Sequence, residues 1–252
     1  MPICRLCLQD KKLIDAHIVP AGFYRYLYPD EVDYPDSKKK SLIMVQDDGH
    51  THPRPIGEYD KNILCAECDN RLGIYDGYVQ ELLLKTIPLP FHKLTDSIQD
   101  IDYKKTKLFF LSLLWRASIS DRPFFNKVDL GPLENKAREM IFNEDPGEVD
   151  DFSVVITKFK NGNQSLTEVL DKNITTPLAV RLTNGARAYI FYFPKGHKVY
   201  IKADSKVLED GLKKMALSPN KPMIILDAGQ YEKSPEFAKL LESVKKAKPK
   251  SQ

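Results

Sequence analysis

Long apolar runs are missing from this sequence. Its most apolar stretch, LFFLSLLW from Leu108 to Trp115, is far shorter than the ~18 to 20 residues that a membrane-spanning helix needs. The first residues, MPICRLC, lack the charged segment followed by an apolar segment that marks a secretory leader. We therefore expect a soluble, cytoplasmic protein in which Leu108 to Trp115 belong to a core helix.

Net charge is also small. The chain carries 38 Lys and Arg against 35 Asp and Glu, a formal net charge of +3, so overall charge does not indicate a nucleic-acid-binding protein. Two basic stretches, Lys38 to Lys40 and Lys245 to Lys250, are interpreted first as solvated runs. The 252 residues, of which 42% are hydrophobic, suffice for one large domain or two smaller ones.

Cysteine is scarce, but its spacing is regular. The only four cysteines form two pairs, Cys4 with Cys7 and Cys65 with Cys68. Two C-x-x-C pairs supply the full tetrahedral thiolate set of a structural zinc site. Disulfides are disfavoured in a cytoplasmic chain, and neither pair has the strand-then-helix context of a thioredoxin-like redox site. The spacing predicts one structural Zn²⁺ with no open position for water.

The surrounding sequence predicts an order of elements. Residues 3–12 are typical of a knuckle and tight turn, and residues 13–19 alternate loosely, as a strand does. A helix is predicted to begin at or just after Cys68, because apolar residues recur there at helical steps: Leu72, Tyr75, Val79, Leu82 and Leu83. Knuckle, strand, long loop, strand, knuckle and helix is the order of a treble-clef zinc module.

His17 lies between the cysteine pairs, in the run DAHIVP. The C-x-x-C pairs, AHIVP and NILCAECDN together resemble the HNH endonucleases in which two cysteine pairs clamp a ββα-metal core. The later runs FFLSLLWRASIS and GPLENKAREMI resemble an uncharacterised bacterial group whose N-terminus carries the same HNH-like finger. The resemblance spans the chain, but only its N-terminal part corresponds to a known chemistry.

This resemblance implies roles for individual residues. His17 would be the general base that deprotonates water, which a neutral imidazole can do near neutral pH. Asp69, directly after the last cysteine and beside Asn70, would hold a catalytic Mg²⁺ or Mn²⁺. Asn62 would orient the loop and the base. The divalent ion would neutralise charge that builds on the phosphate and the leaving oxygen.

Ala16 departs from the HNH pattern. Active HNH enzymes commonly carry Asp or another metal ligand directly before the base, and alanine cannot bind a metal. Asp15 could substitute, since alternate residues of a strand share a face. Asp60 and Asp76 are further carboxylates that could lie near His17, and the sequence does not choose between them.

Each candidate also has a purely structural interpretation. His17 could be a packed residue at a strand end, Asp69 could stabilise a helix start through the helix dipole, and Asn62 could end a turn. His50 and His52 lie in a polar, Pro-rich stretch and are interpreted as exposed loop residues rather than as a metal pair.

A Pro-rich join, residues 87–96, separates an HNH-like zinc module (residues 1–92) from a C-terminal domain (residues 93–252). In that domain we predict a helix over residues 106–120 and another opening at GPLENKAREM, with Pro132 in its first turn. Three later runs predict strands, and two predict helices: FSVVITKF, ARAYIFYFP and KVYIKA, then SKVLEDGLKKMA and PEFAKLLESVKKAK. The turn PKGHK would contain His197. The predicted class is α+β, with a mixed helical and antiparallel β C-terminal domain.

The sequence therefore favours a metal-dependent endonuclease that cleaves DNA, with RNA as the alternative substrate. The rival interpretation is a zinc-stabilised module that has lost catalysis and binds nucleic acid or a protein. The C-terminal domain shows no phosphate loop or nucleophile elbow, so substrate selection, oligomerisation and partner binding all remain open for it. Phosphate contacts would come from basic side chains, which position a strand without reading its sequence: Arg25, Lys38, Lys39, Lys40, Arg54 and Arg71.

Overall fold

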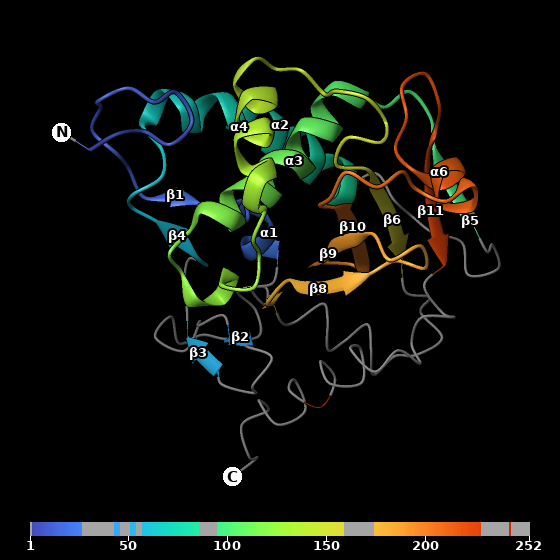
Figure 1. Ribbon diagram of the computed structural model, residues 1–252. Helices are drawn as coiled ribbons and strands as arrows, with labels where there is room; N and C mark the ends of the chain where they lie inside the picture. The colour runs from blue at the N-terminus through green and yellow to red at the C-terminus, as the bar shows by residue number, and fades with distance from the viewer. Residues whose placement is uncertain are drawn as a thin grey trace, which may run out of the picture.

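The computed structural model describes residues 2–26, 43–45, 51–53, 57–85, 95–158 and 174–227, together with Glu242. Helices α2 (Ala66–Lys85), α3 (Tyr103–Ile119) and α4 (Glu134–Phe142) gather on one side of a six-stranded sheet (Figure 1). Shorter helical pieces accompany them: α1 (Ala21–Tyr26) and the 3-10 turns Pro123–Phe125 and Gly131–Leu133. The mixed helix and sheet content confirms the coarse class predicted from the sequence.

The sheet mixes parallel and antiparallel neighbours. Its strand pairs are antiparallel except β11 with β6, which is parallel. Positive φ angles at Lys195 (61°) and Gly196 (74°) form the tight turn between β9 and β10. The spatial order is β5 (Thr95–Ile98), β11 (Met223–Asp227), β6 (Val154–Lys158), β10 (His197–Lys202), β9 (Arg187–Phe193) and β8 (Leu178–Arg181).

Helix α3 is the centre of the core. Asp102 caps it by accepting a hydrogen bond from the Lys105 backbone N–H at 2.9 Å. Buried residues occur all around its circumference, as expected of a helix enclosed by other elements. Phe109 lies 6.2 Å from Phe193 of β9, centroid to centroid, and Phe193 lies 4.8 Å from Phe23 of α1. One apolar cluster consequently runs from Cys4 to Ile225.

Two small sheets accompany the large one. Strand β1 (Ala16–His17) pairs antiparallel with β4 (Tyr59–Asp60). Strand β2 (Ile43–Val45) pairs antiparallel with β3 (Thr51–Pro53) and parallel with β7 (Ile174–Thr175). The last pairing joins backbone from the two predicted domains. The predicted boundary between residues 92 and 93 lies outside the described residues.

Three local predictions are wrong. Helix α2 begins at Ala66 rather than at or after Cys68, because the Cys65 carbonyl already accepts the Asp69 N–H at 3.0 Å. His197 is not a turn residue but the first residue of β10, fully buried on the same face as Val199 and Ile201. His52 lies in β3 rather than in a loop, and His50 lies outside the described residues.

The other predicted elements differ mainly in length. Strands β6, β9 and β10 match the three predicted runs, whereas β5, β8 and β11 were not predicted. The helix expected at SKVLEDGLKKMA is shortened to α6 (Asp210–Met215), and the helix expected at PEFAKLLESVKKAK lies outside the described residues except for Glu242. Among the described residues, no helix combines the length and apolar character needed to cross a membrane.

Candidate metal centre and the His17 cluster

The four cysteines converge at one end of the molecule. A tight turn brings Cys4 and Cys7 together, with the Leu8 N–H donating to the Cys4 carbonyl at 2.9 Å and Leu8 at a positive φ of 59°. Cys65 and Cys68 flank the start of α2. The Cys65 N–H points at Cys4 Sγ, 3.4 Å away, and all four Sγ atoms lie within 4.8 Å of one another.

The environment of the thiols differs from one cysteine to the next. Burial raises the pKa of Cys4, but hydrogen bonds from the backbone of Cys7, Cys65 and Leu6 outweigh it and lower the pKa to about 7. Burial raises the pKa of Cys7 and of Cys68. Cys4 therefore offers a thiolate near neutral pH, while an ion that binds all four sulfurs must displace protons from others.

This donor set fits a zinc ion. Tetrahedral Zn²⁺ with Zn–S bonds of ~2.3 Å places its sulfurs roughly 3.8 Å apart, and no two of the four Sγ atoms are more than 4.8 Å apart. Four free thiols in one cluster are what a structural zinc site requires, and they leave no position for a catalytic water. The cysteine cluster could thus hold a metal such as zinc.

His17 is the last residue of β1. Its side chain is half-buried, and the rings of Tyr24 and Tyr59 lie near it, with centroid separations of 6.3 Å and 6.2 Å. Tyr24 is fixed because its hydroxyl accepts the Glu58 N–H at 3.3 Å. Its ring also lies against Gly57, where a Cβ would come within 2.3 Å of a ring carbon, so only glycine fits there.

Arg116, which the sequence analysis did not single out, anchors His17. Its guanidinium is buried beneath the strand end, and all five of its N–H donors are used. They reach the His17 carbonyl at 3.0 Å, both carboxylate oxygens of Asp76 at 2.8 and 3.0 Å, and the Ser112 carbonyl and hydroxyl. Arg116 thereby ties β1 to α2 from the last turn of α3. In the sequence, the one indication of this role was that Arg116 lies inside the apolar run LLWRASIS.

Asp69 completes the cluster from the first turn of α2. Burial raises the pKa of its carboxyl, the charges of Arg116 and His17 lower it, and the charge of Asp76 raises it. The charges of Asp76, Arg116 and His17 are thus near enough to act on the Asp69 carboxyl. We call these four residues the His17 cluster. Among the described residues, the Asp69 carboxylate makes no side-chain hydrogen bond, whereas Asp76 is held by the bidentate arginine pair.

The remaining proposed catalytic residues lie elsewhere. Asp15 is exposed and lies 3.8 Å from the Lys61 ammonium. Asn62 is also exposed, and its backbone N–H donates to Asp60 at 2.9 Å. Asp60 accepts further hydrogen bonds from Ser120 and Asp121, which makes it a turn anchor. Ala16 points into the core and is fully buried.

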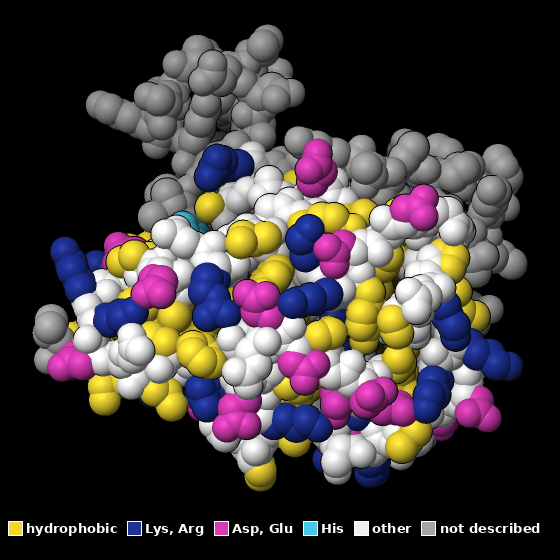
Figure 2. Space-filling view, turned by 90° about the horizontal axis from the view of Figure 1, so that it is seen from above, with side chains coloured by type: hydrophobic (Ala, Val, Ile, Leu, Met, Phe, Trp, Pro, Cys, Tyr) yellow, Lys and Arg dark blue, Asp and Glu magenta, His cyan; other side chains and the backbone are white. Residues whose placement is uncertain are grey.

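Of the residues proposed to contact phosphate, two are described. Arg25 is exposed at the end of α1. Arg71 donates to the Phe142 carbonyl at 2.8 Å and lies 3.4 Å from Glu144, so it also links α2 to α4. Lys38, Lys39, Lys40 and Arg54 lie outside the described residues. On the face shown in Figure 2, basic and acidic side chains are interspersed rather than separated by sign.

No family model matches the chain, and neither a curated protein nor a solved structure matches it. Function must be argued from the cysteine cluster and the His17 cluster themselves.

Proposed function

We propose that the chain is a metal-dependent endonuclease of the HNH type, built on a treble-clef zinc module. The single observation that carries this proposal is that the buried Arg116 holds the His17 carbonyl while the charges of Arg116 and His17 both act on the Asp69 carboxyl. A base and an available carboxylate are what phosphodiester hydrolysis uses, and Arg116, whose charge is paired with Asp76, holds the backbone that carries the base. Nucleic acid, DNA first and RNA second, is the corresponding substrate.

In this proposal each residue has one task. His17 accepts a proton from the attacking water, and the hydrogen bond from Arg116 to its backbone carbonyl fixes the end of β1 that carries the ring. Asp69 binds a divalent cation such as Mg²⁺ or Mn²⁺, because carboxylate oxygen is a ligand that these ions prefer. When bound, such an ion supplies charge neutralisation at the phosphate. The cysteines hold a structural Zn²⁺ that keeps β1 against the start of α2.

A second candidate is a zinc-stabilised module that binds nucleic acid or protein without cleaving it. It is favoured by the loss of two carboxylates from the site: position 16 is a buried alanine, and Asp76 is committed to Arg116. Of the carboxylates in the His17 cluster, this leaves Asp69 alone to hold a catalytic metal. In this candidate the His17 cluster is an internal scaffold, and the bound partner covers the surface around it.

Plasmid nicking separates the two candidates. The unaltered chain should nick supercoiled DNA with Mg²⁺ or Mn²⁺ and stop when EDTA is added, and a structured RNA run in parallel tests the alternative substrate. Asp69→Ala should remove cleavage, with partial recovery at high Mn²⁺. Asp210→Ala is the matched control, since Asp210 also lies in the first turn of a helix. Ala16→Asp should raise activity. Binding without nicking under every metal would favour the second candidate.

A further inference from the structure

The arginine of the His17 cluster is not available to a substrate phosphate. Arg116 is paired with both carboxylate oxygens of Asp76, at 2.8 and 3.0 Å, and its other N–H groups donate to the His17 carbonyl and to Ser112. A nucleic-acid strand is nevertheless held mainly by cations that contact its phosphates. Such a contact therefore has to come from outside the four residues of the cluster.

Two cations lie over the ring of Tyr59, whose centroid is 6.2 Å from that of the His17 ring. The Arg122 guanidinium carbon is 5.7 Å from the Tyr59 centroid, and the Lys61 ammonium is 5.9 Å from it. Lys61 already lies 3.8 Å from the Asp15 carboxylate. Within the described part of the chain, the Arg122 guanidinium makes no hydrogen bond and pairs with no carboxylate. Of the two cations, Arg122 is therefore the uncommitted one.

The position of Arg122 over a ring leaves its donors open. A guanidinium is flat, and contact with an aromatic ring uses its face, whereas its N–H groups point outward along its edge. Two of these groups can donate to two oxygens of one phosphate, which is the geometry that favours arginine at phosphate sites. Arg122 is half-buried, so part of its side-chain entropy is already lost before a ligand binds.

The backbone at Arg122 is fixed to the strand that carries Tyr59. The Ser120 hydroxyl and the Asp121 N–H both donate to the Asp60 carboxylate, at 2.9 and 3.2 Å, and the Arg122 N–H donates to the Ser120 hydroxyl at 3.1 Å. Asp60 follows Tyr59 in β4 and is only 2% exposed. The turn after α3 is thereby held against β4, which pairs with β1, so the free guanidinium starts from a fixed backbone.

We propose that Arg122 binds a backbone phosphate of the nucleic-acid substrate beside His17. The inference rests on the function proposed above, and it adds the residue that holds the strand while His17 and Asp69 act on it. Because Arg122 and His17 both lie near the Tyr59 ring, the contacted phosphate is the scissile one or its immediate neighbour. A contact to the backbone carries no sequence information, so Arg122 positions the strand without selecting a base.

The salt dependence of binding tests this contact apart from cleavage. The zinc-loaded, full-length chain is titrated with a labelled DNA duplex or a structured RNA by fluorescence anisotropy, with no Mg²⁺ or Mn²⁺ present. Arg122→Gln should weaken binding by about tenfold or more at low salt. It should also reduce the slope of log affinity against log salt by about 0.9. Arg122→Lys should keep the slope and lose part of the affinity, because it retains the charge without the fork.

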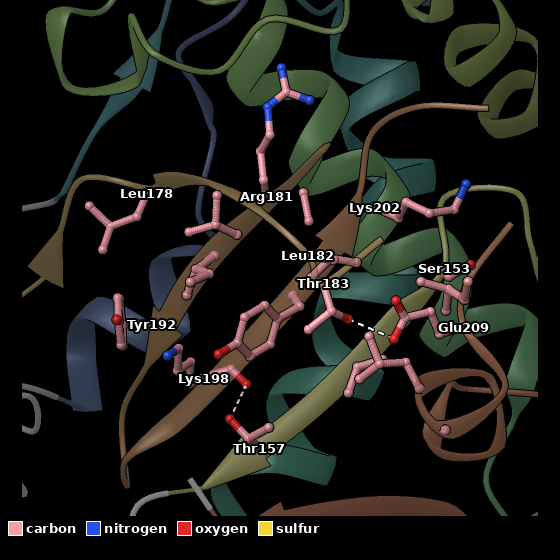
Figure 3. A pocket seen from close by; sticks show the side chains of 18 residues that line it. Ser153, Thr157, Leu178, Arg181, Leu182, Thr183, Tyr192, Lys198, Lys202 and Glu209 are labelled. Carbon is pink, nitrogen blue, oxygen red and sulfur yellow. Dashed lines mark hydrogen bonds between the residues drawn. The ribbon is translucent and has the colours of Figure 1, made fainter. Parts of the chain in front are cut away.

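Two variants with the same change of charge are the matched controls. Lys61→Gln removes the other cation over Tyr59, but one that is paired with Asp15, so the slope should fall by less than half as much as in Arg122→Gln. Arg181→Gln should leave the slope unchanged. Arg181 belongs to β8, where it lines a cavity on the large sheet (Figure 3), and its guanidinium donates to the Gly185 carbonyl at 3.1 Å. Thermal unfolding checks that each variant is folded.

Chemical protection of the unaltered chain gives a readout that needs no variant. Phenylglyoxal modifies accessible guanidinium groups, and mass spectrometry locates the modified residues. Saturating nucleic acid should slow the modification of Arg122 several-fold and leave that of Arg181 unchanged. An Arg122 that is not protected would overturn the contact.

The outcomes separate this inference from the proposed function. Cleavage by the unaltered chain, together with an unchanged slope in a folded Arg122→Gln chain, would overturn the Arg122 contact alone. An equal loss of slope in Lys61→Gln would also overturn it, because general charge would then account for binding. Protection of Arg122 and the expected loss of slope without any cleavage would support the contact and refute the nuclease. An unaltered chain that binds neither DNA nor RNA would overturn both.

Discussion

Strand pairing is meagre at the cysteine end of the molecule and extensive in the large sheet. Strands β1 and β4 pair through two residues each, from Ala16 opposite Asp60 to His17 opposite Tyr59. Strands β9 and β10 pair from Ala188 opposite Lys202 to Phe193 opposite His197, and both faces of that pair are largely buried. Backbone ladders and apolar burial can hold the sheet, but two residue pairs cannot hold β1.

Other interactions must therefore fix the cysteine end. The four thiols and the Arg116–Asp76 pair both join segments far apart in the chain, and Arg116 also donates to the His17 carbonyl. The two regions therefore differ in how much depends on any single residue. The sheet distributes its stability over many side chains, whereas the position of His17 depends on one metal cluster and one arginine.

Metal removal should give the largest effect and separate the regions most clearly. Structural zinc contributes roughly 10 to 16 kcal/mol in small metal domains, so Cys65→Ser or a chelator should remove hydrogen-exchange protection from residues 2–26 and 57–72. Strands β6, β9 and β10 should stay protected. Elemental analysis of the unaltered chain should find one zinc per chain, and zinc added back to chelated protein should restore protection.

Equal loss of protection in both regions would contradict this difference, because the sheet would then depend on the metal as well. Protein purified without chelators and found to lack zinc would refute the structural zinc site itself.

Arg116→Met should give the next largest effect. The substitution leaves the half-buried Asp76 carboxylate without its bidentate partner, and breaking a buried pair costs up to about 3 to 5 kcal/mol. Urea unfolding measures the loss. Asp76→Asn provides the control through a double-mutant cycle: if the pair is the source of the stability, the double variant loses less than the sum of the two single variants. Additive losses would show that Arg116 acts through its other hydrogen bonds.

Lys107→Met should stabilise the protein, because it removes a buried charge from α3. Lys107 is fully buried, and its ammonium makes no hydrogen bond to the described residues. Burial lowers its pKa to about 8, partly offset by Asp151 and Asp150 and reinforced by Lys202. A buried, protonated lysine is unfavourable, so the variant should gain up to about 3 kcal/mol at pH 7.

The pH dependence of that gain has a definite sign. Because the folded pKa is depressed, the penalty is complete below about pH 8 and is relieved as the pH rises from there toward the unfolded value of 10.5. The difference in unfolding free energy between Lys107→Met and the unaltered chain should therefore shrink across this interval. A difference independent of pH would mean that packing, rather than charge, sets the effect.

The spacing of the cysteines and the alternation of apolar residues were enough to predict part of the structure. The spacing of Cys4, Cys7, Cys65 and Cys68 predicted one cluster because two short C-x-x-C turns offer four ligands in the right geometry. Alternation predicted β6, β9 and β10. The edge strands β5 and β8 were missed because each has only four residues. Their composition does not predict a strand, and they are stabilised by pairing with β11 and β9.

Tertiary contacts decided the rest. The role of Arg116 depends on Asp76 and on the His17 carbonyl, which lie on two other elements. His197 was assigned to a turn because PKGHK is typical of one, yet its ring is buried and donates from Nδ1 to the Pro194 carbonyl at 2.8 Å. Burial lowers its pKa to about 3, so it is a neutral core residue. Neither the partners of Arg116 nor the burial of His197 could be predicted from the neighbouring residues in the sequence.

His17→Ala should have the smallest effect on stability of these substitutions. Its ring is only half-buried, so its loss should change the unfolding free energy by less than about 1 kcal/mol. Thermal unfolding and zinc content should match those of the unaltered chain. A destabilisation of several kcal/mol would instead assign the ring a packing role between Tyr24 and Tyr59.

Single-turnover cleavage by His17→Ala tests the central claim most directly. The comparison uses the unaltered chain and the variant at equal zinc content, with a labelled DNA duplex and Mg²⁺ or Mn²⁺. A general base contributes typically 10²- to 10⁴-fold to the rate, so we expect a loss of that size with the melting temperature unchanged. No cleavage by the unaltered chain with either metal, together with a lowered melting temperature of His17→Ala, would contradict the account and leave the non-catalytic binding module.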